Sequence, residues 1–155
     1  MRLLREDFCG TANAACEFVS RHADNRAVGV DIDPEVLAWG KEHRLAALKG
    51  DAPERVELIQ DDVMAVNTPG QDAVLAMNFS YWFFYTRAEL LAYFKHARAQ
   101  LKEDGVLYLD AFGGYDCFKD DEEEVTEHDG FDYVWHLVEF NPIDHMAVYL
   151  SLIHI

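Results

Sequence analysis

Carboxylate side chains follow four of the five short apolar segments that predict strands in this sequence. Glu6 comes after the first segment, Asp31 ends the second, Asp61 and Asp62 follow the third, and Asp110 ends the fifth. Because ligands of an open parallel sheet bind outside the carboxyl ends of its strands, we expect these side chains to face one crevice. A group of carboxylates there suits a ligand that carries hydroxyl groups and positive charge.

The turn after the first strand distinguishes between classes of nucleotide ligand. A dinucleotide fold needs the pattern G-x-G-x-x-G, because bare backbone must approach a pyrophosphate. In this turn Gly10 stands alone among Phe8, Cys9 and Thr11. Asp31 lies 21 positions after Gly10, the usual distance for an acid that binds ribose hydroxyls. The turn therefore favours a nucleoside without phosphates over NAD.

The elements that position these residues follow from short apolar runs that alternate with helical patterns, which is typical of βαβ units. Strands are predicted at residues 3–4, 27–31, 55–59, 73–77 and 106–110, and helices at 12–22, 34–48 and from 87 to a stop at Asp104-Gly105. Asp33-Pro34 is a typical helix start, and Thr86-x-x-Glu89 predicts a capping box.

The C-terminal third of the chain has a different pattern. Residues 131–140 and 145–155 predict two antiparallel strands separated by a turn at Asn141-Pro142. The acidic run at residues 120–124 is predicted to be a solvated loop or helix face. The expected fold is α/β, with a doubly wound, Rossmann-like, mostly parallel sheet, helices on both faces and an antiparallel C-terminal edge hairpin.

Four segments, in order, resemble motifs of the class I S-adenosylmethionine-dependent methyltransferases. Residues 4–12 are similar to the family's glycine-rich first motif, with Glu6 at the position of the motif acid and Phe8 and Ala12 at two of its glycine positions. Residues 28–34 resemble the second motif, in which Asp31 would bind the ribose diol.

Residues 60–63 resemble the third motif, in which Asp62 would meet the adenine amino group, and residues 101–107 resemble the segment that leads into the fifth strand. Asn78 falls where the family contacts the methionine end of the cofactor. The resemblance covers residues 3–114. It implies methyl transfer from S-adenosyl-L-methionine to a small-molecule acceptor, with the cofactor bound by Glu6, Phe8, Cys9, Gly10, Asp31, Ile32, Asp62, Val63 and Asn78.

The acceptor side of this expected site is less defined. The sequence Asn78-Phe79-Ser80-Tyr81 stands in place of the N-P-P-[YF] motif of several amino-methylating branches, so no acceptor atom, catalytic residue or metal ligand is assigned. Residues 81–85 are aromatic and would belong to the core or wall the acceptor pocket. Arg5 would pair with the cofactor's carboxylate or form a salt bridge to Glu6, Asp7 or another acid.

Two other functions remain open from the sequence. An NAD-type oxidoreductase domain would share the fold class, and a non-catalytic nucleoside-binding domain would share the site. The balance of Lys+Arg 13 against Asp+Glu 29, a net charge of −16, argues against nucleic acids and anionic membranes as partners. It also favours a neutral or cationic acceptor over a polyanionic one. Three cysteines without C-x-x-C spacing indicate a reducing cytoplasm.

The 155 residues suit a single domain, and both ends of the chain indicate truncation. Only residues 1–5 precede the first turn, which is short for a central strand that usually runs about 5–6 residues. Residues 150–155 match the in-frame translation of a transposon end used in library preparation, so we expect a sequencing-adapter artefact there. The alternative is a native strand, since the segment alternates acceptably.

Overall fold

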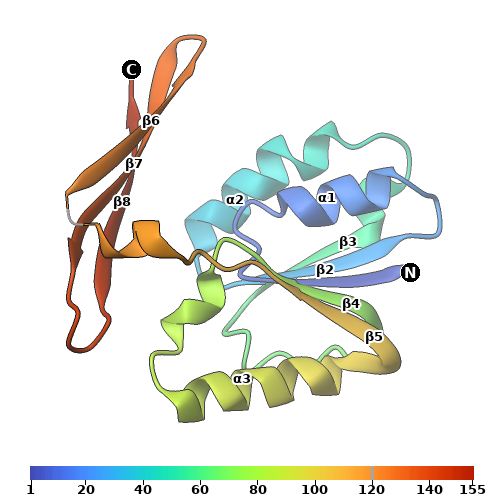
Figure 1. Ribbon diagram of the computed structural model, residues 1–155. Coiled ribbons are helices and arrows are strands. Elements are labelled where there is room, and N and C mark those ends of the chain that lie inside the picture. The colour runs from blue at the N-terminus through green and yellow to red at the C-terminus, as the bar shows by residue number, and fades with distance from the viewer. Residues whose placement is uncertain (120) are drawn as a thin grey trace. The chain divides into compact units, whose positions relative to one another are not determined.

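The computed structural model describes residues 1–119 and 121–155, which form two compact units, Met1–Ala111 and Phe112–Ile155. The first unit is built on a five-stranded parallel sheet with the order β3-β2-β1-β4-β5 (Figure 1). The strands are β1 (Leu3–Asp7), β2 (Arg26–Asp31), β3 (Val56–Gln60), β4 (Gln71–Ala76) and β5 (Leu101–Leu109). Strand order reverses between β1 and β4, so the predicted doubly wound sheet has its switch point there.

Helices cover both faces of this sheet, as predicted. α1 (Asn13–Ser20) and α2 (Pro34–His43) lie on one face and α3 (Arg87–Gln100) on the other (Figure 1). Asp33 caps α2 by accepting hydrogen bonds from the backbone N–H groups of Glu35 and Val36. The capping box of α3 is present, because Thr86 accepts from the backbone of Glu89 and the Glu89 side chain accepts from the backbone of Thr86. Both predicted helix starts are therefore confirmed.

Two apolar clusters, one on each face, fill the space between sheet and helices. On the α1 side the buried residues include Leu4, Val19 and Leu37. On the α3 side they include Val74 and Tyr93. Short 3-10 turns connect the larger elements; they are η1 (Leu45–Ala47), η2 (Ala52–Arg55) and η3 (Ser80–Phe83). The central strand β1 contributes to both faces, because its side chains alternate between them.

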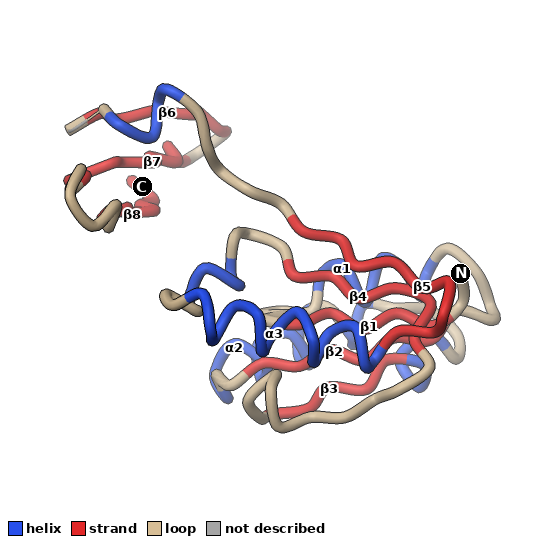
Figure 2. Tube along the Cα trace, turned by 60° about the horizontal axis from the view of Figure 1, so that its bottom comes forward, coloured by secondary structure: helices blue, strands red, loops and turns tan. Residues whose placement is uncertain are grey.

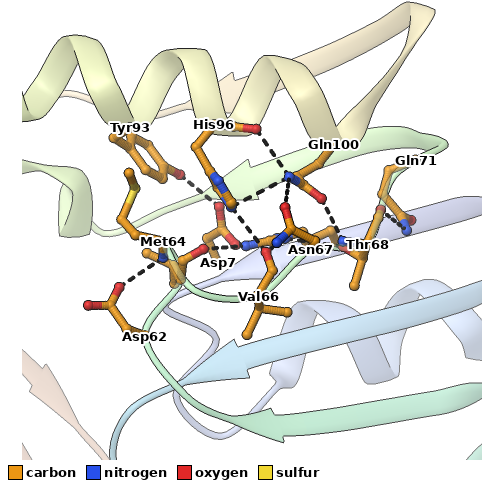
Figure 3. Close-up of polar contacts among 12 residues, drawn as sticks. Asp7, Asp62, Met64, Val66, Asn67, Thr68, Gln71, Tyr93, His96 and Gln100 are labelled. Carbon is orange, nitrogen blue, oxygen red and sulfur yellow. Dashed lines mark hydrogen bonds and ion pairs between the residues drawn. The ribbon is translucent and has the colours of Figure 1, made fainter.

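A buried ion pair lies on the α3 side of β1. Arg5 Nε is 2.6 Å from Asp7 Oδ1, and both side chains are fully shielded from solvent. The remaining guanidinium nitrogens donate to the backbone carbonyls of Val63 and Val66, each at 2.8 Å. Tyr93 on α3 donates its hydroxyl to the other oxygen of Asp7 at 3.0 Å (Figure 3). One charged pair thus joins β1, the segment after β3 and α3. Figure 2 shows the backbone of α3 beside the strands of this sheet.

The end of α3 differs from the prediction. The helix ends at Gln100 and β5 begins at Leu101, whereas the sequence predicted a helix stop at Asp104-Gly105. Leu101 pairs with Gln71 before the ladder shifts register. Gly105 is needed for close packing, since a Cβ there would lie 2.9 Å from Leu101 Cδ2 and 3.0 Å from the Gln71 carbonyl. The glycine therefore marks an irregular strand and not a helix end.

The second unit is an antiparallel sheet with the order β6-β7-β8. After η4 (Tyr115–Phe118), it contains β6 (Glu122–His128), β7 (Phe131–Phe140) and β8 (Ala147–His154). The predicted hairpin is present as β7 and β8, in a sheet of its own. The expectation of a loop or helix face at residues 120–124 is wrong for residues 122–124, which begin β6, while residue 120 lies outside the described residues. All of β6 is exposed, so no apolar alternation indicated a strand.

No helix in the described residues is both long and apolar enough to cross a membrane.

Replacing Asp7 by asparagine tests the buried ion pair. We expect Asp7→Asn to lower the free energy of unfolding by about 3 kcal/mol, because it leaves the guanidinium of Arg5 buried without its negative partner. Urea denaturation followed by circular dichroism measures the loss. The control is Glu17→Gln, which removes a charge from the exposed pair with Arg21 and should leave the midpoint unchanged. Equal midpoints for the two variants would contradict the assignment.

Candidate functional site

The turn after β1 alternates between ordinary and left-handed backbone. Phe8 has φ 55°, Gly10 has φ 53° and Ala12 has φ 58°. Left-handed backbone costs a residue with a Cβ about 1–2 kcal/mol, and glycine avoids that cost. Phe8 and Ala12 occupy the two positions that the resemblance assigned to glycine, so the backbone keeps the glycine conformation without the glycines.

The side chain of Phe8 offsets part of this cost. Its ring centroid lies 5.9 Å from that of Tyr93 and 6.3 Å from that of Phe84, in the cluster beneath α3. Burying an aromatic ring in such a cluster stabilises the fold by about 1.5–3 kcal/mol. The turn is therefore anchored by packing on one side, and its backbone remains at the carboxyl edge of the sheet.

Asp31 joins the first turn to the ends of β2 and β3. Its Oδ2 accepts a hydrogen bond of 2.7 Å from the backbone N–H of Gly10, and its Oδ1 accepts one of 3.0 Å from Asp33. Its own carbonyl accepts from the N–H of Asp61 at 3.1 Å. The side chain is half-buried, and each carboxylate oxygen has a second lone pair that a ligand hydroxyl can use. The geometry fits the diol of a ribose.

Glu6 lies beneath the start of α1. Its carboxylate is buried and accepts a hydrogen bond of 2.8 Å from the backbone N–H of Ala15. The N-cap residue of α1, Ala12, has no side-chain cap, so the strand residue supplies an acceptor that the helix itself lacks. The pKa of Glu6 is raised to about 7, chiefly by burial; the backbone N–H groups of α1 act in the lowering direction and the nearby charge of Asp31 in the raising direction.

The segment after β3 presents two exposed acids and one buried apolar residue. Asp62 Oδ1 accepts from the backbone N–H of Met64 at 2.8 Å (Figure 3), and Asp61 Oδ1 accepts from the N–H of Asp62 at 2.8 Å. Val63 is buried, and its carbonyl is held by Arg5. The sequence left open whether Arg5 pairs with the cofactor's carboxylate or with an acid of the chain. In the structure Arg5 pairs with Asp7 and is enclosed by the segment after β3.

The loop after β4 has left-handed backbone at two consecutive residues, Asn78 with φ 58° and Phe79 with φ 53°. The carboxylate of Asp110 accepts from both of their N–H groups, each at 2.9 Å. The carbonyl of Asp110 accepts from the Tyr81 hydroxyl at 2.9 Å. Sequence reasoning noted Asp110 at a strand end and gave it no role. Its position at the end of the predicted fifth strand was the one signal that the sequence offered.

The aromatic run at residues 81–85 is divided between the core and the surface. Tyr81 is buried and Phe84 packs against the core beneath α3. Trp82, Phe83 and Tyr85 are 40%, 74% and 71% exposed, respectively. The exposed rings lie on the loop that carries Asn78, so this edge offers an apolar surface beside polar backbone.

These residues meet at two neighbouring places on the carboxyl edge. Glu6, Gly10, Asp31 and Asp61 belong to one hydrogen-bonded and charge-coupled group at the ends of β1, β2 and β3. Asn78 lies on the loop after β4, the strand that pairs with β1 on its other side. Among residues 1–119 and 121–155, no group of three or more His, Cys, Asp or Glu side chains could hold a metal ion.

The edge fits a nucleoside better than a pyrophosphate. Ile32 directly follows Asp31 and is 70% exposed, which gives a flat base an apolar contact. Asp31 supplies acceptors for ribose hydroxyls. Gly10 is the only glycine in this turn, whereas a dinucleotide fold uses several to bring bare backbone to a pyrophosphate. The residues present therefore fit an adenosine-bearing cofactor.

Comparisons with known proteins agree with this geometry. A family model described as a methyltransferase domain matches residues 9–107. No curated protein sequence matches the chain significantly.

Solved structures show where the fold recurs. An S-adenosylmethionine-dependent methyltransferase from Clostridium acetobutylicum has a TM-score of 0.69 and 18% identity, over 99% of this chain and 65% of that one. A sugar N-methyltransferase from a Streptoalloteichus species has a TM-score of 0.66 and 21% identity, over 99% and 64%. An amino pentose methyltransferase from Micromonospora echinaspora, with its cofactor bound, has a TM-score of 0.67 and 20% identity, over 98% and 66%. This chain thus spans slightly less than two thirds of each.

The raised pKa of Glu6 gives a pH-dependent prediction. The folded chain keeps a proton on Glu6 up to about pH 7, whereas the unfolded chain releases it near the ordinary value of 4.5. The free energy of unfolding therefore decreases as the pH rises from 4.5 through 7, because the unfolded chain releases this proton more readily than the folded chain does. Glu6→Gln keeps an acceptor for Ala15 and cannot ionise, so its stability relative to the original chain should rise by about 2–3 kcal/mol between pH 5 and pH 8.

Urea denaturation at the two pH values measures this difference. Glu17→Gln on the exposed face of α1 is the matched control and should show the same relative stability at both. A Glu6→Gln difference that is independent of pH would show that Glu6 ionises with its ordinary pKa in the folded chain.

Proposed function

The chain belongs to the methyltransferase domain family, and from this premise we propose that it transfers a methyl group from S-adenosyl-L-methionine to a small-molecule acceptor. The observation that carries the proposal is the hydrogen bond between Gly10 N–H and Asp31 Oδ2 at 2.7 Å. It fixes a carboxylate at the end of β2 beside the first turn, inside the segment that the family model matches.

The cofactor roles proposed for individual residues follow their positions. Asp31 accepts from the ribose hydroxyls, and the exposed Ile32 packs on the adenine ring. Asp62 and the backbone of Val63 border the same ring at the end of β3. Glu6 lies near the end of β1, and Phe8, Cys9 and Gly10 form the first turn, in which Gly10 gives the ligand the closest approach to the backbone. Asn78 contacts the methionine end from the β4 loop.

The bound cofactor supplies an electrophilic methyl group on a sulfonium. The work left to the chain is to hold the acceptor in line with that methyl group and to exclude water. The exposed rings of Trp82 and Phe83 suit the second task, since they lie on the loop that carries Asn78. Tyr81 donates its hydroxyl to the carbonyl of Asp110, so its place here is structural.

The proposed acceptor is a neutral or cationic small molecule, and an amino sugar is the first to test. The net charge of −16 disfavours polyanions. Two of the similar structures are described as a sugar N-methyltransferase and an amino pentose methyltransferase. Exposed aromatic rings beside carboxylates are suited to a molecule that has both an apolar sugar face and an amine. The same negative charge argues against nucleic acids and membranes as partners. Three free cysteines support a cytoplasmic location.

A ligand screen separates this proposal from its rivals. Thermal shift with S-adenosylhomocysteine, with NAD and with buffer alone should show stabilisation by the first only. Stabilisation by NAD would favour the oxidoreductase alternative. Transfer of tritium from methyl-labelled cofactor to a panel of amino sugars then distinguishes an enzyme from a non-catalytic nucleoside-binding domain, which would bind the cofactor and transfer no label.

Asp31→Ala tests the ribose assignment. The substitution removes acceptors for hydrogen bonds that involve a charged group, which contribute about 1.5–3 kcal/mol, so calorimetry should show S-adenosylhomocysteine binding about 10–100-fold more weakly. Asp24→Ala makes the same change in net charge on an exposed turn between α1 and β2 and should bind as the original chain does. Unchanged affinity in Asp31→Ala would refute the role of this carboxylate.

A further inference from the structure

The loop after β4 holds a backbone conformation that its sequence does not favour. Asn78 and Phe79 are consecutive and both left-handed. Asparagine adopts this region more readily than other residues with a Cβ, whereas a bulky aromatic residue rarely does. Phe79 therefore carries most of the strain, and some interaction must hold the pair in place.

The carboxylate of Asp110 is that interaction. Its two oxygens accept one hydrogen bond each, Oδ2 from Asn78 N–H and Oδ1 from Phe79 N–H, both at 2.9 Å. A carboxylate can serve two adjacent N–H groups because it offers acceptors only. The Tyr81 hydroxyl, which donates to the Asp110 carbonyl at 2.9 Å, holds the same residue from the other end of the loop. Three hydrogen bonds thus join Asp110, directly after β5, to the loop after β4.

We propose that Asp110 is a positioning residue, which fixes the left-handed Asn78-Phe79 pair so that Asn78 faces the methionine end of the bound cofactor. The inference rests on the proposed function, since it requires that the cofactor bind at this edge. The bonds lie in an exposed to half-buried region and not in the core. The role therefore concerns the geometry of the loop more than global stability.

A double-mutant cycle in the full chain tests the proposal. Asp110→Asn is close in shape, but its NH2 group faces an N–H donor, so one of the two hydrogen bonds is lost. We expect S-adenosylhomocysteine to bind at least tenfold more weakly to this variant by calorimetry. The thermal unfolding midpoint should change little, which separates loop geometry from global unfolding.

The second arm changes Phe79. Glycine adopts left-handed backbone without strain, so in a Phe79→Gly background Asp110→Asn should weaken binding less than threefold. Phe79→Ala is the matched control, because it also removes the ring but keeps a Cβ. In that background the full loss of at least tenfold should return.

The outcomes of the cycle are distinct. The proposal is supported if Asp110→Asn weakens binding and if Phe79→Gly, but not Phe79→Ala, rescues the loss. Equal affinity in Asp110→Asn and the original chain, or equal losses in the glycine and alanine backgrounds, overturns it while leaving the proposed function intact. Failure of the original chain to bind S-adenosylhomocysteine overturns the proposed function and this inference with it.

Discussion

The buried guanidinium of Arg5 is the interaction on which the geometry of the carboxyl edge depends. A cation without solvent is tolerated only where charge and hydrogen bonds replace water. Asp7 supplies the charge, and the carbonyls of Val63 and Val66 supply acceptors. The segment that follows β3 is thereby bound to the central strand, and Tyr93 brings α3 into the same network. The position of Asp62 at the edge follows from how Val63, its neighbour, is held.

Strain is concentrated in the two loops that flank the switch point. The first turn has left-handed Phe8 and Ala12, and the β4 loop has left-handed Asn78 and Phe79. Different interactions offset the backbone strain in these two loops. A ring packed beneath α3 holds the first turn, whereas a single carboxylate holds the second. Strained backbone of this kind persists at functional sites because the surrounding structure over-determines it, and here it lies on both sides of the proposed cofactor.

Local signals in the sequence were sufficient for most of the first unit. Asp33-Pro34 and the Thr86 capping box specify helix starts through short-range hydrogen bonds, and buried parallel strands leave uninterrupted apolar runs. What the sequence could not provide depends on long-range pairing. β5 begins at Leu101, before the apolar run that predicted it, because a register shift between Gln71 and Ala73 of β4 accommodates the additional residues. β6 is fully exposed and pairs through its backbone, so its glutamates gave no strand pattern.

In the candidate site, too, features set by local sequence were predictable and features set by long-range contacts were not. That Gly10 and Asp31 lie together was predictable, because a turn and an acid at a fixed spacing define one local geometry. The partner of Arg5 and the role of Asp110 were not, since each depends on a residue supplied by another part of the fold. Asp110 meets residues 31 and 32 positions away in the chain. A strand-end carboxylate alone does not tell which loop it will hold.

The way the edge acids are held explains how their charge becomes available to a ligand. Asp31 and Asp110 are fixed by backbone N–H groups, whereas Arg5, Arg21 and Lys102 are paired with acids elsewhere in the unit. A backbone amide positions a carboxylate without neutralising it. The negative potential therefore remains at the carboxyl edge, where it favours a ligand with positive charge. The proposed cofactor carries that charge on its sulfonium and its amino group, and loses part of it when the methyl group leaves.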